Sequence, residues 1–187
     1  MSTKAEPLLT VSDLEALPDD GNKYELFEGE LFVSRAPTLS HQRTLGNVYA
    51  ILRAYLDKNP IGEVILNPGV IFDRFNSAIP DAIFVTIEQF STIGSEDHIT
   101  QAPALAIEVL STGAGNARRD REVKRQVYGK HGVKEYWIID PQQRSFEIYR
   151  LEGNALKLSQ TLINDDEVLT PVLPGFTCRI GEIFASR

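Results

Sequence analysis

The chain has 187 residues, of which 42% are hydrophobic and 24% are charged, and its formal net charge is −7. This composition is typical of a globular protein that buries a core, and we expect a single domain over residues 1–187. No stretch approaches the roughly 18 apolar residues that span a bilayer. The first residues lack the apolar segment of a secretory signal, and the single cysteine, Cys178, excludes an internal disulfide. We therefore expect a cytoplasmic protein that does not bind membranes.

The charge is unevenly distributed along the sequence. Between Arg118 and Lys134, seven Lys or Arg accompany two acids, so this window carries +5 and the rest of the chain −12. The negative total argues against tight non-specific binding to nucleic acid, which needs surplus cations to neutralise phosphates. The basic window is compatible with cations gathered near a cleft, but equally with the solvated face of a helix.

The first half of the chain is expected to begin with a short helix, because Ser12-Asp13-Leu14-Glu15 fits a capping box and Pro18 stops it. Alternating runs around Glu28-Gly29 predict a hairpin, and apolar residues at helical spacing predict a long helix. A turn-rich break is expected after the next two strands. The hairpin is expected at 24–33, the long helix at 39–58, the two strands at 63–66 and 69–73, and the break at 74–78.

The second half alternates strands and helices before it ends in β structure. Strands are expected at 81–85, 105–110, 135–140, 145–151 and 155–162. A helical turn is expected at 87–90, a basic helix ended by Gly132 at 117–131, and a final short stretch at 181–185. The strand–helix–strand order in the middle implies a right-handed crossover within a mixed sheet. The predicted class is α/β (α+β), with one central sheet flanked by helices, an additional N-terminal hairpin and a C-terminal β meander.

One acid interrupts a strand that should be apolar throughout. Glu108 lies in the middle of Leu105–Leu110, and burying an ionised carboxylate is costly unless a cation, a metal or hydrogen bonds compensate. Asp81 opens another apolar strand, and Lys124 lies on the apolar side of the basic helix. Neighbouring strands lie about 4.8 Å apart, so Asp81 and Glu108 could together bind Mg²⁺ or Mn²⁺ if their strands pair. The bound metal would activate water for phosphodiester hydrolysis, with Lys124 adding positive charge.

Structural roles are the alternative for the same side chains. Glu108 could form a buried ion pair with Lys124 or Arg121 without any chemistry, Asp81 could end a turn, and Lys124 could be solvated. His41 could be a polar residue near a helix start.

The ordered set of short motifs resembles the Uma-type family of restriction-endonuclease-like proteins, a branch of the PD-(D/E)XK nuclease superfamily. The resemblance extends over nearly the whole chain. It rests on Pro80-Asp81, Glu108-Val109-Leu110-Ser111, Asp120-Arg121 with Lys124, Gly132–Trp137, Asp140-Pro141, Leu9-Thr10, Tyr24–Leu26, Gly29–Leu31, Pro37, His41 and Leu173–Gly175.

The resemblance implies a restriction-endonuclease-like fold in which Asp81 and Glu108 bind the metal. Leu110 occupies the position of the usual lysine, and Lys124 on the next helix fits as its relocated equivalent. His41 and Glu25 resemble further positions near the site. The implied activity is a metal-dependent endonuclease acting on DNA as a homodimer. The alternative is a catalytically inactive homodimeric nucleic-acid-binding or interaction protein that retains the fold.

Overall fold

Six strands form the central sheet of the protein, whose computed structural model describes residues 8–93, 98–111 and 118–185. In pairing order they are β10 (Ala155–Ile163), β9 (Ser145–Glu152), β8 (Glu135–Asp140), β7 (Leu105–Val109), β6 (Ala82–Thr86) and β3 (Gly62–Leu66). β7 and β8 run parallel, whereas every other neighbouring pair in this sheet is antiparallel. The sheet is therefore mixed, with a crossover between β7 and β8, as the sequence predicts.

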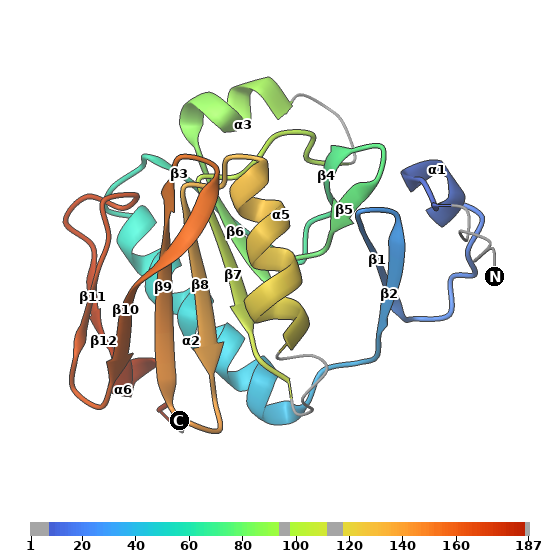
Figure 1. The fold of residues 1–187 in the computed structure, drawn as a ribbon. Coiled ribbons are helices and arrows are strands. Elements are labelled where there is room, and N and C mark those ends of the chain that lie inside the picture. Colours follow the sequence, from blue (N-terminus) through green and yellow to red (C-terminus); the bar gives the residue numbers. More distant parts are fainter. Residues whose placement is uncertain (1–7, 94–97, 112–117, 186–187) are drawn as a thin grey trace.

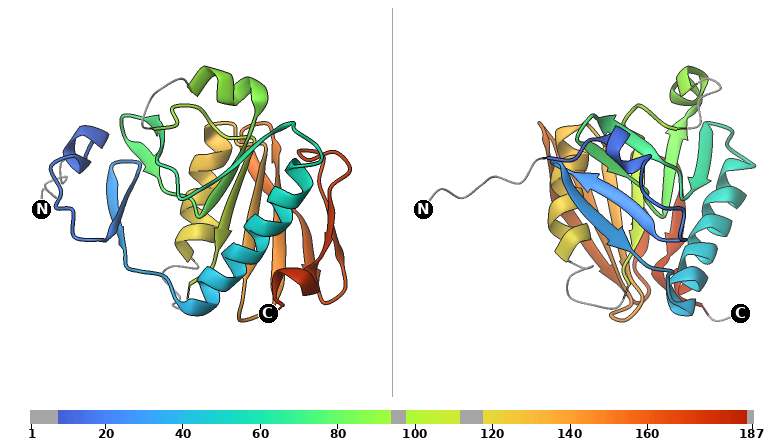
Figure 2. Two further views of the ribbon diagram at one scale, coloured as in Figure 1. Left: turned by 180° about the vertical axis from the view of Figure 1, so that it is seen from behind. Right: turned by 90° about the vertical axis from the view of Figure 1, so that its right-hand side faces the viewer.

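Helices cover both faces of this sheet (Figures 1 and 2). The long α2 (Leu39–Leu56) and the short α6 (Ile180–Ile183) lie on one face. A π-helical turn, η1 (Arg119–Lys124), continues directly into α5 (Arg125–Lys130) on the other face. α3 (Ile87–Ile93) follows β6 at one end of the sheet. No helix in the described part of the chain is both long and apolar enough to cross a membrane.

The side chains of β7 divide between the two faces of the sheet. Leu105, Ile107 and Val109 pack in the apolar cluster beneath α2, whereas Ala106 packs in the cluster beneath α5. Because side chains alternate along a strand, Glu108 points toward the face covered by η1 and α5. A strand buried on both faces should be apolar throughout, so the acid within it indicates a specific arrangement around Glu108.

A second sheet lies beside the first and is built around the predicted hairpin. Its strands pair in the order β2 (Glu30–Ser34), β1 (Lys23–Phe27), β5 (Asn76–Ala78) and β4 (Val70–Asp73). Figure 1 shows this sheet on the side of α5 that faces away from β9. The prediction of a break over 74–78 is partly wrong, because the polar segment Asn76–Ala78 pairs between β1 and β4. The C-terminal meander continues into a further short pair, β11 (Glu167–Leu169) with β12 (Thr177–Arg179).

One helix prediction needs correction at its start. The first helix, α1 (Val11–Leu14), is capped by Thr10 and not by Ser12, since Asp13 Oδ2 accepts hydrogen bonds from the amide (2.7 Å) and hydroxyl (2.6 Å) of Thr10. The expected loop and helix start over 112–117 lie outside the described residues. From Arg118 onward the basic helix forms as predicted, and it ends before Gly132, whose φ of 89° is left-handed.

Candidate active site

Asp81 and Glu108 face each other across two neighbouring strands. β6 and β7 are antiparallel with Ala82 opposite Ile107, so one further step in this register brings Asp81 opposite Glu108. The Val109 amide donates a hydrogen bond of 2.9 Å to Asp81 Oδ2, which closes the ladder at this end. The structure thus brings the two predicted acids together on the face of the sheet covered by η1.

Lys124 reaches the same place from η1 and is almost completely buried, with 2% of its surface exposed. Its Nζ lies 2.8 Å from Glu108 Oε1, 3.0 Å from Glu25 Oε1 and 3.6 Å from Asp120 Oδ1. Three carboxylates therefore surround one ammonium group. The π-helical turn directs both Asp120 and Lys124 inward, and such turns are frequent at functional sites.

Two basic side chains other than Lys124 contact Asp81. His41 Nε2 lies 2.9 Å from Asp81 Oδ2, and Lys23 Nζ lies 3.5 Å from Oδ1. The other ring nitrogen of His41 is buried without a hydrogen-bond partner among the described residues. Burial alone would raise the pKa of Asp81, but His41, Lys23 and the Val109 amide together lower it below its ordinary value.

These side chains line one cavity of about 390 Å³, here called the central cavity. The strands contribute acids from two sheets, α2 contributes its first turn, and η1 contributes cations. The lining residues central to the chemistry are Lys23, Glu25, His41, Asp81, Glu108, Arg119, Asp120 and Lys124. The predicted residues Asp81, Glu108, Lys124 and His41 therefore share a single water-accessible space.

The charge balance of this cluster favours a shared proton. Burial raises the pKa of Glu108 to about 8, even though Lys124 opposes the shift, because Asp81, Asp120 and Glu25 add negative charge. Burial also raises the pKa of Asp120. Lys124 remains charged despite its burial, because Glu108, Glu25 and Asp120 raise its pKa well above the ordinary value.

Asp81 and Glu108 could supply only part of the coordination shell of a hard metal ion. Among the residues that the structure describes, no group of three or more His, Cys, Asp or Glu side chains is arranged to hold a metal. Mg²⁺, however, is commonly bound by one or two carboxylates, with waters and substrate phosphates completing the octahedron. Asp81 and Glu108 supply such a pair at the edge of the central cavity.

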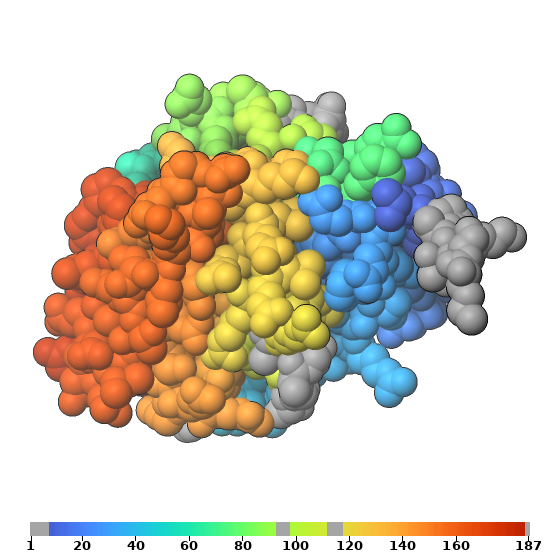
Figure 3. Space-filling view, in the orientation of Figure 1, coloured from blue at the N-terminus to red at the C-terminus, as the bar shows by residue number. Residues whose placement is uncertain are grey.

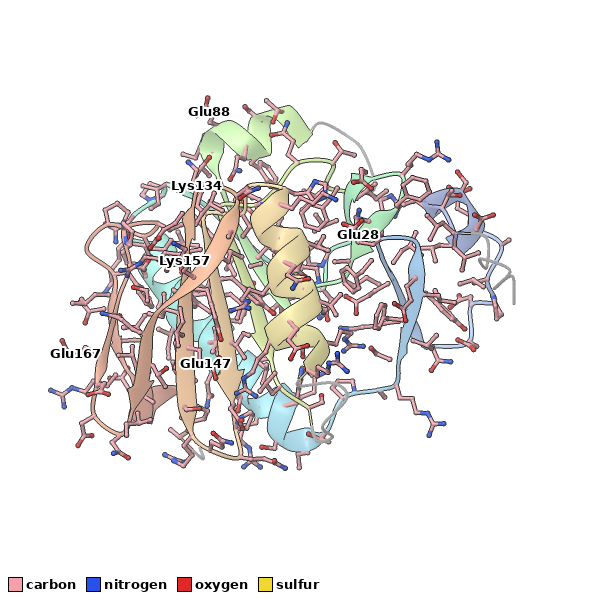
Figure 4. All side chains as sticks on the ribbon, viewed as in Figure 1. Glu28, Glu88, Lys134, Glu147, Lys157 and Glu167 are labelled. Carbon is pink, nitrogen blue, oxygen red and sulfur yellow. The ribbon has the colours of Figure 1, made fainter. Side chains whose placement is uncertain are left out.

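The cations between Arg118 and Lys134 divide between the cavity and the solvated face of the helix, so both interpretations of the sequence apply to part of the segment. Arg119 and Lys124 point into the central cavity. The outward cations instead pair with acids, as Arg121 does with Glu147 at 2.8 Å and Lys130 with Glu28 at 2.7 Å. This segment is exposed between the β9–β10 hairpin and the second sheet (Figure 3), and both acids and bases lie on the same face, among them Glu28, Glu147, Lys134 and Lys157 (Figure 4). This face is therefore not a continuous cationic surface.

Lys23 and Tyr128 belong to the site but were not predicted from the sequence. Glu25, which the family resemblance places near the site, contacts Lys124 and accepts a hydrogen bond of 2.9 Å from the Ile79 amide. Lys23 shares the same face of β1, and the period-two spacing of Lys23 and Glu25 is a signal that could have revealed it. Tyr128 resembles an ordinary core residue, but its hydroxyl donates a hydrogen bond of 3.0 Å to Glu108 Oε1.

The mixed sheet flanked by helices is the restriction-endonuclease-like architecture that the sequence predicts. The solved structure of "a putative nuclease belonging to DUF820" from Anabaena variabilis ATCC 29413 has the same fold, with a TM-score of 0.77. It is 20% identical in sequence, and the match covers 94% of this chain and 97% of that chain. No curated protein matches the sequence. Residues 11–181 match the Uma2 family, described as "Putative restriction endonuclease", and the chain belongs to this family.

Proposed function

We propose that the protein is a metal-dependent endonuclease that hydrolyses phosphodiester bonds in DNA. The observation that carries this proposal is the convergence of Asp81, Glu108 and Lys124 on one cavity, with Lys124 Nζ 2.8 Å from Glu108. Two strand-borne acids beside a buried lysine supply a cation site and a fixed positive charge where a scissile phosphate would lie.

Asp81 and Glu108 would hold Mg²⁺ or Mn²⁺ through their carboxylate oxygens, and the ion would polarise the phosphate and lower the pKa of bound water. The protein's own groups prepare this arrangement. His41 and the Val109 amide both contact Asp81 Oδ2 and fix the orientation of that carboxylate. Lys124 keeps its proton and can orient the attacking water. Because Glu108 holds a proton up to about pH 8, cation binding should release that proton and strengthen as the pH rises.

A second candidate is a catalytically inactive protein that retains the fold and binds nucleic acid or another partner. The observation in its favour is that Lys124 already contacts three carboxylates, which is also the geometry of a structural ion pair. For either candidate we propose a cytoplasmic homodimer, since cutting or binding both strands of a duplex suits two copies of one site.

Nicking of supercoiled plasmid in Mg²⁺ or Mn²⁺ distinguishes the two candidates. We expect the wild-type protein to nick, and the Glu108→Gln and Lys124→Met variants to lose at least about 100-fold in rate, in the range of lost electrostatic stabilisation. Glu88→Gln is the matched control, because Glu88 is exposed at the far end of the molecule (Figure 4). Equal cutting by all four proteins would indicate a contaminating nuclease and would refute the proposal. Absence of cutting together with measurable DNA binding would favour the second candidate.

A further inference from the structure

A second pocket opens beside the central cavity at the start of α2. It has a volume of about 150 Å³ and is here called the arginine pocket. Its polar walls come from α2, from the turn between β8 and β9, and from the segment after α6; the polar side chains are Ser40, Arg43, Thr44, Asn47 and Arg144. Figures 1 and 2 show that the start of α2, this turn and the C-terminal segment lie at the same end of the molecule.

The two arginines of the pocket are not used in ion pairs. Among the described residues, the arginines that pair with carboxylates are Arg53, Arg118, Arg119, Arg121, Arg150 and Arg179. Arg43 and Arg144 are not in that set. Arg144 instead lies over the ring of Phe184, with its guanidinium carbon 5.3 Å from the ring centroid, and its Nη1 donates a hydrogen bond of 3.4 Å to the Phe184 carbonyl oxygen. These contacts position the guanidinium without neutralising its charge.

Further donors complete the pocket. Thr44 is buried, with 4% of its surface exposed, and lines the pocket. In the 18-residue α2, the first turn begins at Leu39, and the Gln42 amide makes the first bond back to the carbonyl of Thr38. The amides of Leu39 and Ser40 therefore precede the hydrogen-bonded ladder of the helix. The helix dipole favours an anion near the first turn of α2, from which Ser40 lines the pocket.

The walls of the pocket are already fixed without a ligand. The Asn47 side-chain amide donates hydrogen bonds of 3.0 Å to the carbonyls of both Ile183 and Ala185. Asp140 Oδ1 accepts the amides of Gln142 and Gln143, at 2.9 and 3.0 Å, and so shapes the turn that presents Arg144. A ligand would therefore meet preorganised donors, which reduces the entropy cost of binding.

We infer that the arginine pocket binds a phosphate group, and specifically a backbone phosphate of the DNA duplex whose scissile phosphate lies in the central cavity. Thr38 and His41 line the central cavity, while Ser40, Arg43 and Thr44 line the arginine pocket, so the first two turns of α2 contribute residues to both sites. This inference rests on the proposed function for its choice of ligand.

Salt-dependent binding of a fluorescein-labelled 20-base-pair duplex, measured by anisotropy in EDTA, tests the inference. The Arg43→Gln/Arg144→Gln double variant should bind about tenfold more weakly near 50 mM salt, and its log–log salt slope should fall by about one. Thr44→Val, which removes only the hydroxyl, should bind about threefold more weakly, within the range of one hydrogen bond. Arg53→Gln is the matched control on the same helix, where Arg53 pairs with Asp57 at 3.0 Å, and it should stay within twofold of the wild type.

Inorganic phosphate separates the two sources of the ligand. If phosphate raises the melting temperature of the wild type but not of the double variant, while both bind the duplex equally, the pocket binds free phosphate and the assignment to DNA is overturned. If the double variant binds the duplex with the affinity and salt slope of the wild type, and the wild type nicks plasmid, the assignment of the pocket is overturned and the proposed function stands. Weakened binding by the double variant, together with a wild type that never cuts, would support the pocket and refute the hydrolysis.

Discussion

Replacing Glu108 with Gln tests the charge state of the buried cluster. The change removes one ionisable group and preserves the size of the side chain. Burial and the neighbouring acids raise the pKa of Glu108 to about 8 in the folded protein, against the opposing effect of Lys124. The unfolded chain releases the same proton near pH 4.3. Between these values, the folded protein holds a proton that the unfolded chain lacks.

The sign and size of the effect follow from proton linkage. A group whose pKa is raised by folding contributes stability that is complete below its unfolded pKa and is lost as the pH rises through its folded pKa. This group alone should cost the wild type about 1.4 kcal/mol per pH unit within that window, or about 3 kcal/mol between about pH 5.5 and 7.5. Glu108→Gln lacks this loss. Its free energy of unfolding, relative to the wild type, should therefore rise by roughly that amount over the same range.

Urea denaturation in EDTA at several pH values measures this difference. Glu88→Gln serves as the control, because Glu88 is exposed, and its difference from the wild type should stay within about 0.5 kcal/mol at each pH. A difference between wild type and Glu108→Gln that does not change with pH would refute the reasoning. Glu108 would then be ionised throughout, and a constant large loss of stability would identify it as one half of a structural ion pair with Lys124.

Three other predictions use the same measurement. Lys124→Met leaves the surrounding acids without their cation, so it should lower the free energy of unfolding by about 3–5 kcal/mol near pH 8 and by less near pH 5, whereas a pH-independent loss would contradict this. Burial opposes the lowered pKa of Asp81, but His41 and Lys23 outweigh it. The wild type's advantage over Asp81→Asn should therefore be complete above about pH 5 and shrink as the pH falls through and below the ordinary aspartate pKa of about 3.9. A constant advantage would be evidence against it. Gly62→Ala would place a Cβ 2.1 Å from the Val85 carbonyl oxygen and should lower the free energy of unfolding by about 1–3 kcal/mol. Gly46→Ala has open space around it and should raise the free energy of unfolding by up to about 1 kcal/mol. Equal effects of the two substitutions would refute this steric argument.

The sequence contains enough information to locate the acids because local patterns report on burial. An acid within an apolar run such as Leu105–Val109 conflicts with the pattern of a strand, and sequential strands usually pair. Asp81 and Glu108 were therefore predictable as a pair, and in the structure both line the central cavity. Lys124 was predictable because it shares the apolar side of its helix.

The remaining contacts depend on tertiary packing that no local pattern encodes. Glu25 reaches Lys124 from a different sheet, so its role depends on how two sheets meet. Tyr128 has the spacing of a core residue, and only its hydroxyl contact with Glu108 distinguishes it. Asn76–Ala78 has the composition of a turn, but it forms a strand because β1 and β4 both offer it partners.

Anomalous scattering from crystals grown in Mn²⁺ tests the central claim most directly. The account predicts a manganese peak between the carboxylates of Asp81 and Glu108, with Lys124 still beside Glu108, and it predicts that the peak vanishes in crystals of Glu108→Gln. Strong diffraction data with no peak at these carboxylates, or with the metal bound elsewhere on the protein, would contradict it.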